Sequence, residues 1–451
     1  MSDRDVQAST GSSERHTVIL AFACNFILLG SYYILRPVRD TVATVVGVGK
    51  LQELFTATFI GTIVASALYS ALASKIRLTR LLPGVFWFWL MNVVAFALLF
   101  RAAPENRELA ATYYVWFSVV NLFMVSVFWS LMVDVFSADQ ATRWFARIAA
   151  GGALGAIAGP LATRALVKTL GLSGLMMLAA CGFAMVIVLV HLLMHQKQRL
   201  HGRADAQTSR LDHALRGGAF EGLAEMLKSK YFLSQAGFIL LMTWVNTVAY
   251  FCQTDLIAHA YRGLAERAQA LADIDLIVNV CTAAILLLGV GRFMRRFGVT
   301  ASLLLNPLFM AIAFLATALS PTLLMIQLLQ IVRRVAQYAI ARPSREVCFT
   351  VVDQSSRYKT KNAIDTVVYR FGDVSSAWLQ TGLTSLGYGL EGALLLGASA
   401  SVLWGAVALG LGRRYGRARA SQDEIKSAEL ALPANPGTAP CALAILRPDS
   451  R

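Results

Sequence analysis

The sequence predicts an all-α membrane protein with twelve transmembrane helices in two pseudo-symmetric six-helix halves. Hydrophobic residues make up 57% of the 451 residues and charged residues only 15%, which is typical of a chain that turns most of its surface to lipid. Twelve apolar segments approach the length of about 20 residues that a bilayer crossing requires. A polar motif that begins at Asp139 recurs 214 residues later, at Asp353. Composition, segment length and repeat therefore point to the same architecture.

The expected spans are helices, because lipid cannot satisfy the hydrogen-bonding groups of an open backbone. The fifth and eleventh are the weakest, since small and polar residues dilute their apolar character. The twelve segments are 17–35, 53–74, 81–101, 110–133, 148–168, 173–195, 231–252, 271–291, 300–320, 322–342, 362–386 and 390–411.

The spans define the expected domains and topology. The expected domains are an N-terminal tail (1–16), a first half (17–195), a linker (196–230), a second half (231–411) and a disordered C-terminal tail (412–451). Loops on the linker side carry 20 Lys and Arg residues, whereas the opposite loops carry 9. The positive-inside rule then places both termini in the cytoplasm, in a multi-pass protein of a bacterial cytoplasmic membrane. The same rule explains the net charge of +15 without a nucleic-acid partner.

The repeated motif reads D-Q-x-[ST]-R-[WY]-x-x-[RK]-x-A. In both copies it follows one apolar segment and precedes another, so the halves are parallel repeats, as in major-facilitator-like secondary transporters. Its polar residues are expected on the cytoplasmic side as gate or domain contacts. These are Asp139, Arg143, Arg147, Asp353, Arg357 and Lys361.

Charged residues within a membrane bundle are costly, which makes them candidates for function. Arg36, Arg39 and Asp40 end the first span around Pro37, which removes a helix donor and favours a break. If the helix continues beyond that break, the two arginines line an internal site and bind an anion. The alternative is an interfacial cluster on the outer side.

Two further groups lie in later spans. Arg333 and Arg334 are adjacent in the tenth, where a guanidinium fork suits phosphate or carboxylate; two interfacial anchors are the alternative. Arg370 and Asp373, together with Asp365, lie in the eleventh, and the three-residue spacing lets Arg370 and Asp373 pair on one face. That pair either opens to bind substrate or only neutralises itself.

Other chemistry has no support in the sequence. The six cysteines are scattered and show no paired spacing, which argues against a disulfide framework or a zinc site. Gly151, Gly155 and Gly159 have the spacing of close helix packing. No hydrolase elbow, Walker loop or HExxH is present, so neither an enzyme, a metal nor a cofactor is expected. The expected partners are the lipid bilayer and a small anionic solute.

At several of these residues the chain resembles the ATP/ADP translocase family of plastids and obligate intracellular bacteria. The resemblance extends over about residues 20–410. It implies a twelve-helix antiporter that exchanges ATP and ADP without hydrolysing them. The matching stretches are Tyr33-Ile34-Leu35-Arg36-Pro37-Val38-Arg39-Asp40, Val127-Phe128-Trp129, Pro343-Ser344-Arg345-Glu346 and Tyr358-Lys359-Thr360-Lys361-Asn362-Ala363-Ile364-Asp365.

The resemblance also implies four charged intramembrane positions, two basic and two acidic. The first basic position corresponds to Arg39. The acidic positions fall near Phe117 and Ala249, which carry no charge. The second basic position falls near Asp373, which carries the opposite charge. Three functions therefore stay open: an exchanger of nucleotides or another phosphorylated anion, a permease for a non-nucleotide solute, and a non-transporting protein that reuses the fold.

Overall fold

The computed structural model describes residues 3–75, 78–201, 219–352 and 354–431. Within these ranges the chain forms helices and no strand. The long helices of the first half are α1 (Asp3–Val46), α2 (Leu51–Lys75), α3 (Leu78–Ala102), α4 (Arg107–Val135) and α5 (Ala138–His201). After the short α6 (Ala219–Lys228), the second half has α7 (Lys230–Ala260), α8 (Leu264–Leu288), α9 (Val290–Leu319), α10 (Leu323–Ala336), α11 (Arg342–Cys348), α12 (Gln354–Ala363), α13 (Tyr369–Ser385) and α14 (Leu390–Ala431).

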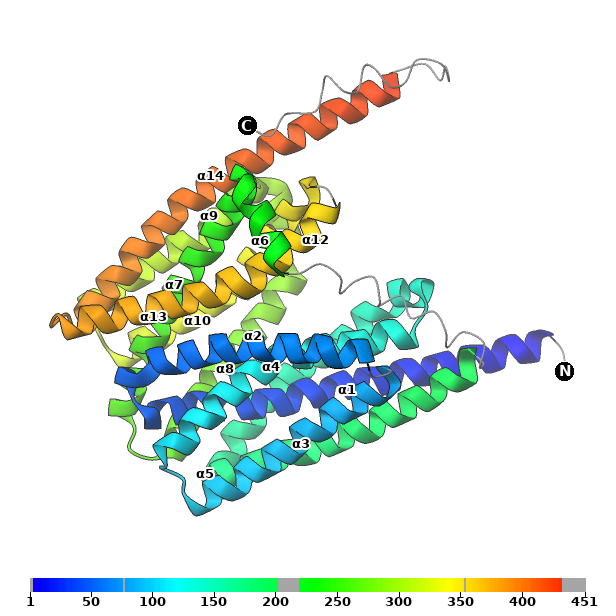
Figure 1. Cartoon of the computed structure of the whole chain (residues 1–451), viewed down its shortest axis with the longest axis horizontal. Coiled ribbons are helices and arrows are strands. Elements are labelled where there is room, and N and C mark those ends of the chain that lie inside the picture. Colours follow the sequence, from blue (N-terminus) through cyan, green and yellow to red (C-terminus); the bar gives the residue numbers. More distant parts are fainter. Residues whose placement is uncertain (1–2, 76–77, 202–218, 353, 432–451) are drawn as a thin grey trace.

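The helices form two bundles (Figure 1). One hydrophobic core is built almost entirely from residues before 194, and a second core from residues 226–415. Helices α1 to α5 lie together on one side of the figure, and α7, α9, α10, α13 and α14 lie on the other. Each bundle thus has a hydrophobic core, and α8 of the second half also packs against α1 and α5 of the first half.

Ten of the described helical stretches are long and apolar enough to cross a membrane. The longest, Asp139–Gln196, contains Gly171 at φ 68° and ψ −175°, a conformation that glycine adopts without steric cost. It therefore holds the fifth and sixth predicted spans. The predicted eleventh span, 362–386, is helical but is not among the ten. When Asp139–Gln196 is counted as two spans and 362–386 is added, the described helices correspond to the twelve predicted spans.

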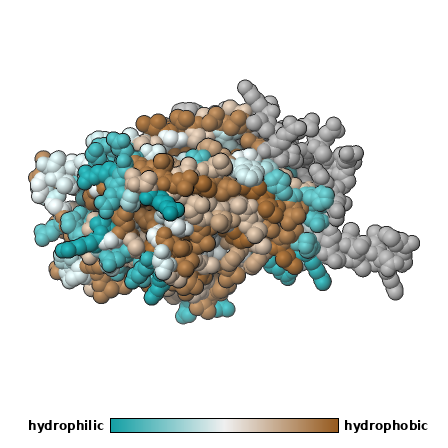
Figure 2. Space-filling view, turned by 90° about the horizontal axis from the view of Figure 1, so that it is seen from below, coloured by the Kyte–Doolittle hydropathy of each residue, from teal (hydrophilic) through white to brown (hydrophobic). Residues whose placement is uncertain are grey.

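The surface agrees with a multi-pass membrane protein. Apolar residues cover the middle of the molecule, and hydrophilic residues gather towards its ends (Figure 2). Large apolar side chains exposed on the surface include Ile63, Leu98, Leu287, Leu319 and Val402. Lipid is the solvent in which such a surface is stable.

Several boundaries differ from the sequence expectation. Helix α1 runs from Asp3 to Val46 without interruption, with Pro37 inside it, so the expected break at Pro37 is wrong. The expected tail 1–16 is helical from Asp3 onwards, and α14 continues to Ala431. The expected disorder from 412 therefore does not hold for 412–431, while 432–451 lies outside the described residues. Helix α6 lies within the expected linker 196–230.

Glycines bring α5 into close contact with α1, as their spacing predicts. A Cβ atom on Gly155 would lie 2.1 Å from the Phe26 carbonyl oxygen, and one on Gly159 would lie 2.5 Å from the Gly30 carbonyl oxygen. Neither position has space for a side chain. The resulting packing fixes α1, which carries the first charged group, within the first half.

Candidate functional site

Four helices contribute charged side chains to one region between the halves, which we call the central charged layer. Two of the arginines, Arg36 and Arg333, lie close enough to interact electrostatically, and Arg333 also interacts with Asp373. The layer consists of Arg36, Arg39 and Asp40 on α1, Asp275 on α8, Arg333 and Arg334 on α10, and Arg370 and Asp373 on α13. The seven residues chosen from the sequence as substrate contacts all lie here.

Asp275 is the carboxylate at the centre of the layer. Its Oδ2 lies 3.8 Å from Arg36 Nε, and its Oδ1 lies 2.5 Å from Arg334 Nη2. The side chains of Asp275 and Arg334 are 2% and 5% exposed. Among the described residues, however, neither Asp275 oxygen accepts a well-aligned hydrogen bond. The arrangement is therefore a buried charge pairing with unused hydrogen-bonding capacity.

Arg39 and Asp40 form a second pair. Arg39 Nε donates to Asp40 Oδ1 at 2.9 Å, and the Tyr250 hydroxyl of α7 donates to the same oxygen at 3.2 Å. The Arg39 guanidinium carbon lies 5.4 Å from the centre of the Tyr114 ring and 6.0 Å from that of Phe117, within the range of cation–π attraction. Arg39 is thus held by one carboxylate and two aromatic faces. The interfacial alternative does not describe it, because its side chain is only 16% exposed.

Arg333 differs from the other arginines of the layer because it donates hydrogen bonds to side-chain amide oxygens. Its Nη2 donates to Gln330 Oε1 at 2.7 Å, and its Nη1 donates to Asn246 Oδ1 at 2.8 Å. Amides satisfy the donors without neutralising the charge. A π-helical turn, Gln337–Ala341, follows directly, and such turns are frequent at functional sites.

Arg370 and Asp373 are only loosely paired. Arg370 Nη1 lies 3.5 Å from Asp373 Oδ2, and its Nη2 lies 3.5 Å from the Ser118 carbonyl oxygen of α4. Asp365, the third charge predicted for this group, lies elsewhere. It pairs with Arg345, while the adjacent Glu346 pairs with Lys361 at 2.5 Å. Two sequence motifs of the second half, Pro343–Glu346 and Tyr358–Asp365, are therefore joined by ion pairs.

The described residues of the repeated motif lie near the start of corresponding helices in the two halves. Asp139, Arg143 and Arg147 lie exposed at the start of α5, where the Arg147 guanidinium lies 4.6 Å from the Trp144 ring centre. Arg357 and Lys361 lie in α12, at the start of the corresponding helix; Asp353 lies outside the described residues. The ion pair between Lys361 and Glu346 stays within the second half.

The halves also contact each other at the end of the molecule away from residues 201 and 219. Trp378 Nε1 donates to Thr56 Oγ1 at 3.0 Å, and Arg267 Nη1 donates to Thr44 Oγ1 at 2.8 Å. Arg164 and Asp273 form an ion pair of 3.3 Å nearby. These contacts join α1, α2 and α5 to α8 and α13, and in Figure 1 the two bundles converge at this end.

The sequence reasoning missed Asp275, Tyr250 and Asn246. Asp275 had a usable signal, because it is a carboxylate inside the predicted span 271–291 and should have been singled out with the other intramembrane charges. Tyr250 and Asn246 are neutral, and nothing in the local pattern sets them apart. Phe117 and Ala249 are buried and apolar, and the carboxylates of the layer are those of Asp40, Asp275 and Asp373.

Solved structures with a similar fold are membrane transporters. A crystal structure of the nucleoside transporter NupG aligns with a TM-score of 0.59 at 13% identity and covers 90% of this chain and 98% of that chain. A POT family transporter in complex with 5-aminolevulinic acid gives 0.61 at 11% identity, covering 88% and 96%. A bacterial homologue of the iron transporter ferroportin, in an inward-facing state, gives 0.61 at 12%, covering 88% and 98%. These likenesses establish the major-facilitator-like fold.

A comparison with curated protein sequences gave no significant match. The family model for the TLC ATP/ADP transporter matches residues 109–394, a stretch that begins in α4, ends in α14 and includes most of the charged layer. The chain is thus a multi-pass membrane protein with the fold of a secondary transporter, and it belongs to the TLC ATP/ADP transporter family.

Proposed function

We propose that this protein is a non-enzymatic carrier that exchanges a phosphorylated anion, with ATP and ADP as the first candidates, by alternating access. The observation that carries the proposal is the charge balance of the central charged layer. Five arginines face three aspartates there, which leaves a net charge of +2. A polyphosphate supplies the missing negative charge.

Arg333 is the position where that charge is most needed. Its guanidinium is half-buried and is held by amide oxygens, so a phosphate can replace the amides and neutralise the arginine at the same time. Bidentate contacts between guanidinium and phosphate oxygens are among the stronger hydrogen bonds in proteins. Arg36, Arg39 and Arg370 are the other proposed contacts, since each lies beside a carboxylate that an anion can displace.

The arrangement of the halves supports alternating access. The inter-half contacts at the end away from residues 201 and 219 close that side, and the charged layer lies at the junction between the halves. We assign the closed side to the exterior and both termini to the cytoplasm of a bacterial inner membrane, following the positive-inside rule. Labelling single cysteines introduced at residues 105 and 425 in intact cells tests this: only position 105 should react with an impermeant maleimide.

The carrier proposal is tested in liposomes. Purified protein is reconstituted, and uptake of labelled ATP is followed with and without internal ADP, for the wild type and for Arg39→Ala. Uptake that requires both internal ADP and Arg39 supports nucleotide exchange. Absent uptake, in protein that retains a cooperative melting transition, contradicts it.

A permease for a non-nucleotide solute is the second candidate. It is favoured by Phe117 and Ala249, where the family resemblance expects carboxylates and the structure has buried apolar side chains. ADP-independent uptake of another anion, with ATP neither transported nor inhibitory, would establish this candidate over the first.

A further inference from the structure

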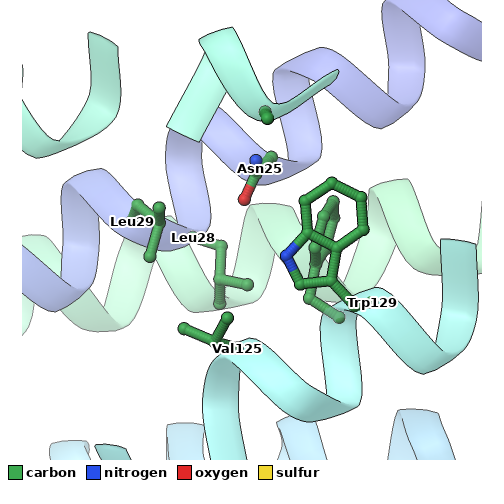
Figure 3. A pocket seen from close by; sticks show the side chains of 7 residues that line it. Asn25, Leu28, Leu29, Val125 and Trp129 are labelled. Atoms are coloured by element: carbon green, nitrogen blue, oxygen red, sulfur yellow. The ribbon is translucent and has the colours of Figure 1, made fainter. Parts of the chain in front are cut away.

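A small pocket of about 200 Å³ lies between α1, α4 and α5 of the first half. Figure 3 shows the Trp129 indole on one side, Leu28 and Leu29 on the opposite side, and the Asn25 amide above. The Trp129 ring is held by edge contact with Phe128, at 5.5 Å between ring centres, and by Phe145, at 5.2 Å. A flat aromatic wall faces an aliphatic wall across a space too small for a whole nucleotide, since drug-sized ligands need roughly 300–1,000 Å³.

The pocket lies on the same helix faces as the central charged layer. On α1, Asn25 and Leu29 precede Arg36 by eleven and seven residues, which are near-whole numbers of turns. On α4, Val125 and Trp129 follow Ser118 by seven and eleven residues, and the Ser118 carbonyl accepts from Arg370 of the second half. Both helices therefore turn the pocket and the charged layer toward the same side.

The separation suits a nucleotide. Leu29 and Asn25 lie about 10 and 16 Å along α1 from Arg36, at 1.5 Å per residue, a span comparable to the distance from the base to the terminal phosphates of an extended nucleoside triphosphate. A base in the pocket thus places its phosphates near the arginines. A simple phosphate would use the charged layer and leave the pocket empty.

The polar group of the pocket has a defined orientation. Asn25 Nδ2 donates to the Ile148 carbonyl oxygen at 2.9 Å, which fixes the amide, and Figure 3 shows the Asn25 oxygen on the side away from that nitrogen. An amide oxygen can only accept hydrogen bonds. It therefore favours a base with an exocyclic amino group, such as adenine, over one with a carbonyl group at that position, such as hypoxanthine.

From these observations we infer that the pocket is the base subsite of the carrier: Trp129 stacks on an aminopurine, and Asn25 accepts from its exocyclic amine. This inference rests on the proposed function, because it assumes that the phosphates bind the central charged layer. It adds a specificity for the base that the arginines cannot provide.

The test compares three ligands that share a triphosphate: ATP, inosine triphosphate and inorganic tripolyphosphate. Their affinities are measured by competition with labelled ATP on the purified full-length protein. The wild type should bind ATP more tightly than tripolyphosphate by roughly 5- to 150-fold, the range given by aromatic stacking on a base. It should prefer ATP to inosine triphosphate by roughly 2- to 12-fold, as expected for one hydrogen bond.

Trp129→Ala should remove the advantage of ATP over tripolyphosphate and leave tripolyphosphate binding unchanged, which also shows that the variant is folded. Trp129→Phe should keep most of the advantage. Trp87→Ala is the matched control, because Trp87 lies 50% exposed on α3, away from the pocket.

The subsite is overturned if Trp129→Ala keeps the full preference for ATP, or if Trp87→Ala loses it equally. Equal binding of ATP and tripolyphosphate by the wild type overturns the subsite but leaves a phosphate carrier standing. Binding of none of the three ligands overturns the proposed function and the subsite with it.

Discussion

Asp275 of α8 lies 3.8 Å from Arg36 of α1, so a carboxylate of the second half faces a guanidinium of the first half in the interior of the protein. Burial increases the energetic cost of losing this contact. Removing one partner from a buried charge pair leaves the other without compensation, which is far more costly than losing an exposed pair. Asp275 is therefore expected to matter for stability as well as for substrate binding.

Asp275→Asn should lower the free energy of unfolding by about 3–5 kcal/mol, because Arg334 then stays buried without a counter-ion. The melting temperature of the detergent-purified protein, in a fixed detergent and lipid, measures the effect. Asp273→Asn is the control on the same helix: its side chain is 35% exposed and pairs with Arg164, so the loss should be at most about 1 kcal/mol. Equal losses for the two variants would contradict a special role for Asp275.

Arg333→Gln should reduce ATP uptake by roughly 10- to 150-fold, the range that corresponds to one charge-assisted hydrogen bond. Folding should change little, because the substitution removes hydrogen bonds to the side-chain amides of Gln330 and Asn246 and breaks no direct ion pair described for Arg333. Initial uptake rates in liposomes over a range of ATP concentrations provide the measurement. Arg107→Gln, which removes an exposed arginine at the start of α4 outside the charged layer, should keep near-normal uptake; similar defects in both variants would argue against direct substrate contact by Arg333.

Gly155→Ala should destabilise the protein by about 1–3 kcal/mol, the usual cost of overpacking, because the new methyl group would meet the Phe26 carbonyl oxygen of α1. Gly84→Ala is the matched substitution in α3, where nothing lies within 4 Å of the added atom. It should be neutral or slightly stabilising, since alanine has the higher helix propensity. Thermal melting of both variants compares them, and an unchanged melting temperature for Gly155→Ala would show that α1 and α5 are less tightly packed than described.

Exchanging the charges of Glu346 and Lys361 tests the ion pairs between the two motifs of the second half. Each single reversal, Glu346→Lys or Lys361→Glu, places like charges at the 2.5 Å contact and should reduce expression and melting temperature. The double variant restores opposite charges and should recover most of the loss. Because both side chains are partly exposed, the coupling free energy from the double-mutant cycle should be about 0.2–1 kcal/mol. A coupling of zero would mean that the contact contributes nothing to the fold.

Much of the fold can be predicted from the sequence. All the spans except the eleventh follow from hydropathy, because lipid requires a continuous apolar stretch of sufficient length from a crossing helix. The parallel halves follow from the repeated motif, and the approach of α5 to α1 from the glycine spacing. The course of α1 through Pro37 could not be predicted, because the preference of proline to end a helix is a local tendency that packing overrides.

The sequence alone also picks out the arginines that lie together in the central charged layer. A charge inside an apolar segment is costly unless a partner compensates it, so such a charge marks a candidate for function. The arginines that stand out in this way are Arg36, Arg39, Arg333, Arg334 and Arg370. Only the tertiary structure decided their partners: Arg36 and Arg334 share Asp275, Arg39 pairs with its neighbour Asp40, and Arg333 donates to side-chain amides. Pairing depends on which helix faces meet across the two halves, whereas hydropathy and local spacing describe each helix by itself. The cost of a charge can therefore be predicted from its own segment, and its compensation only from the packing of the whole chain.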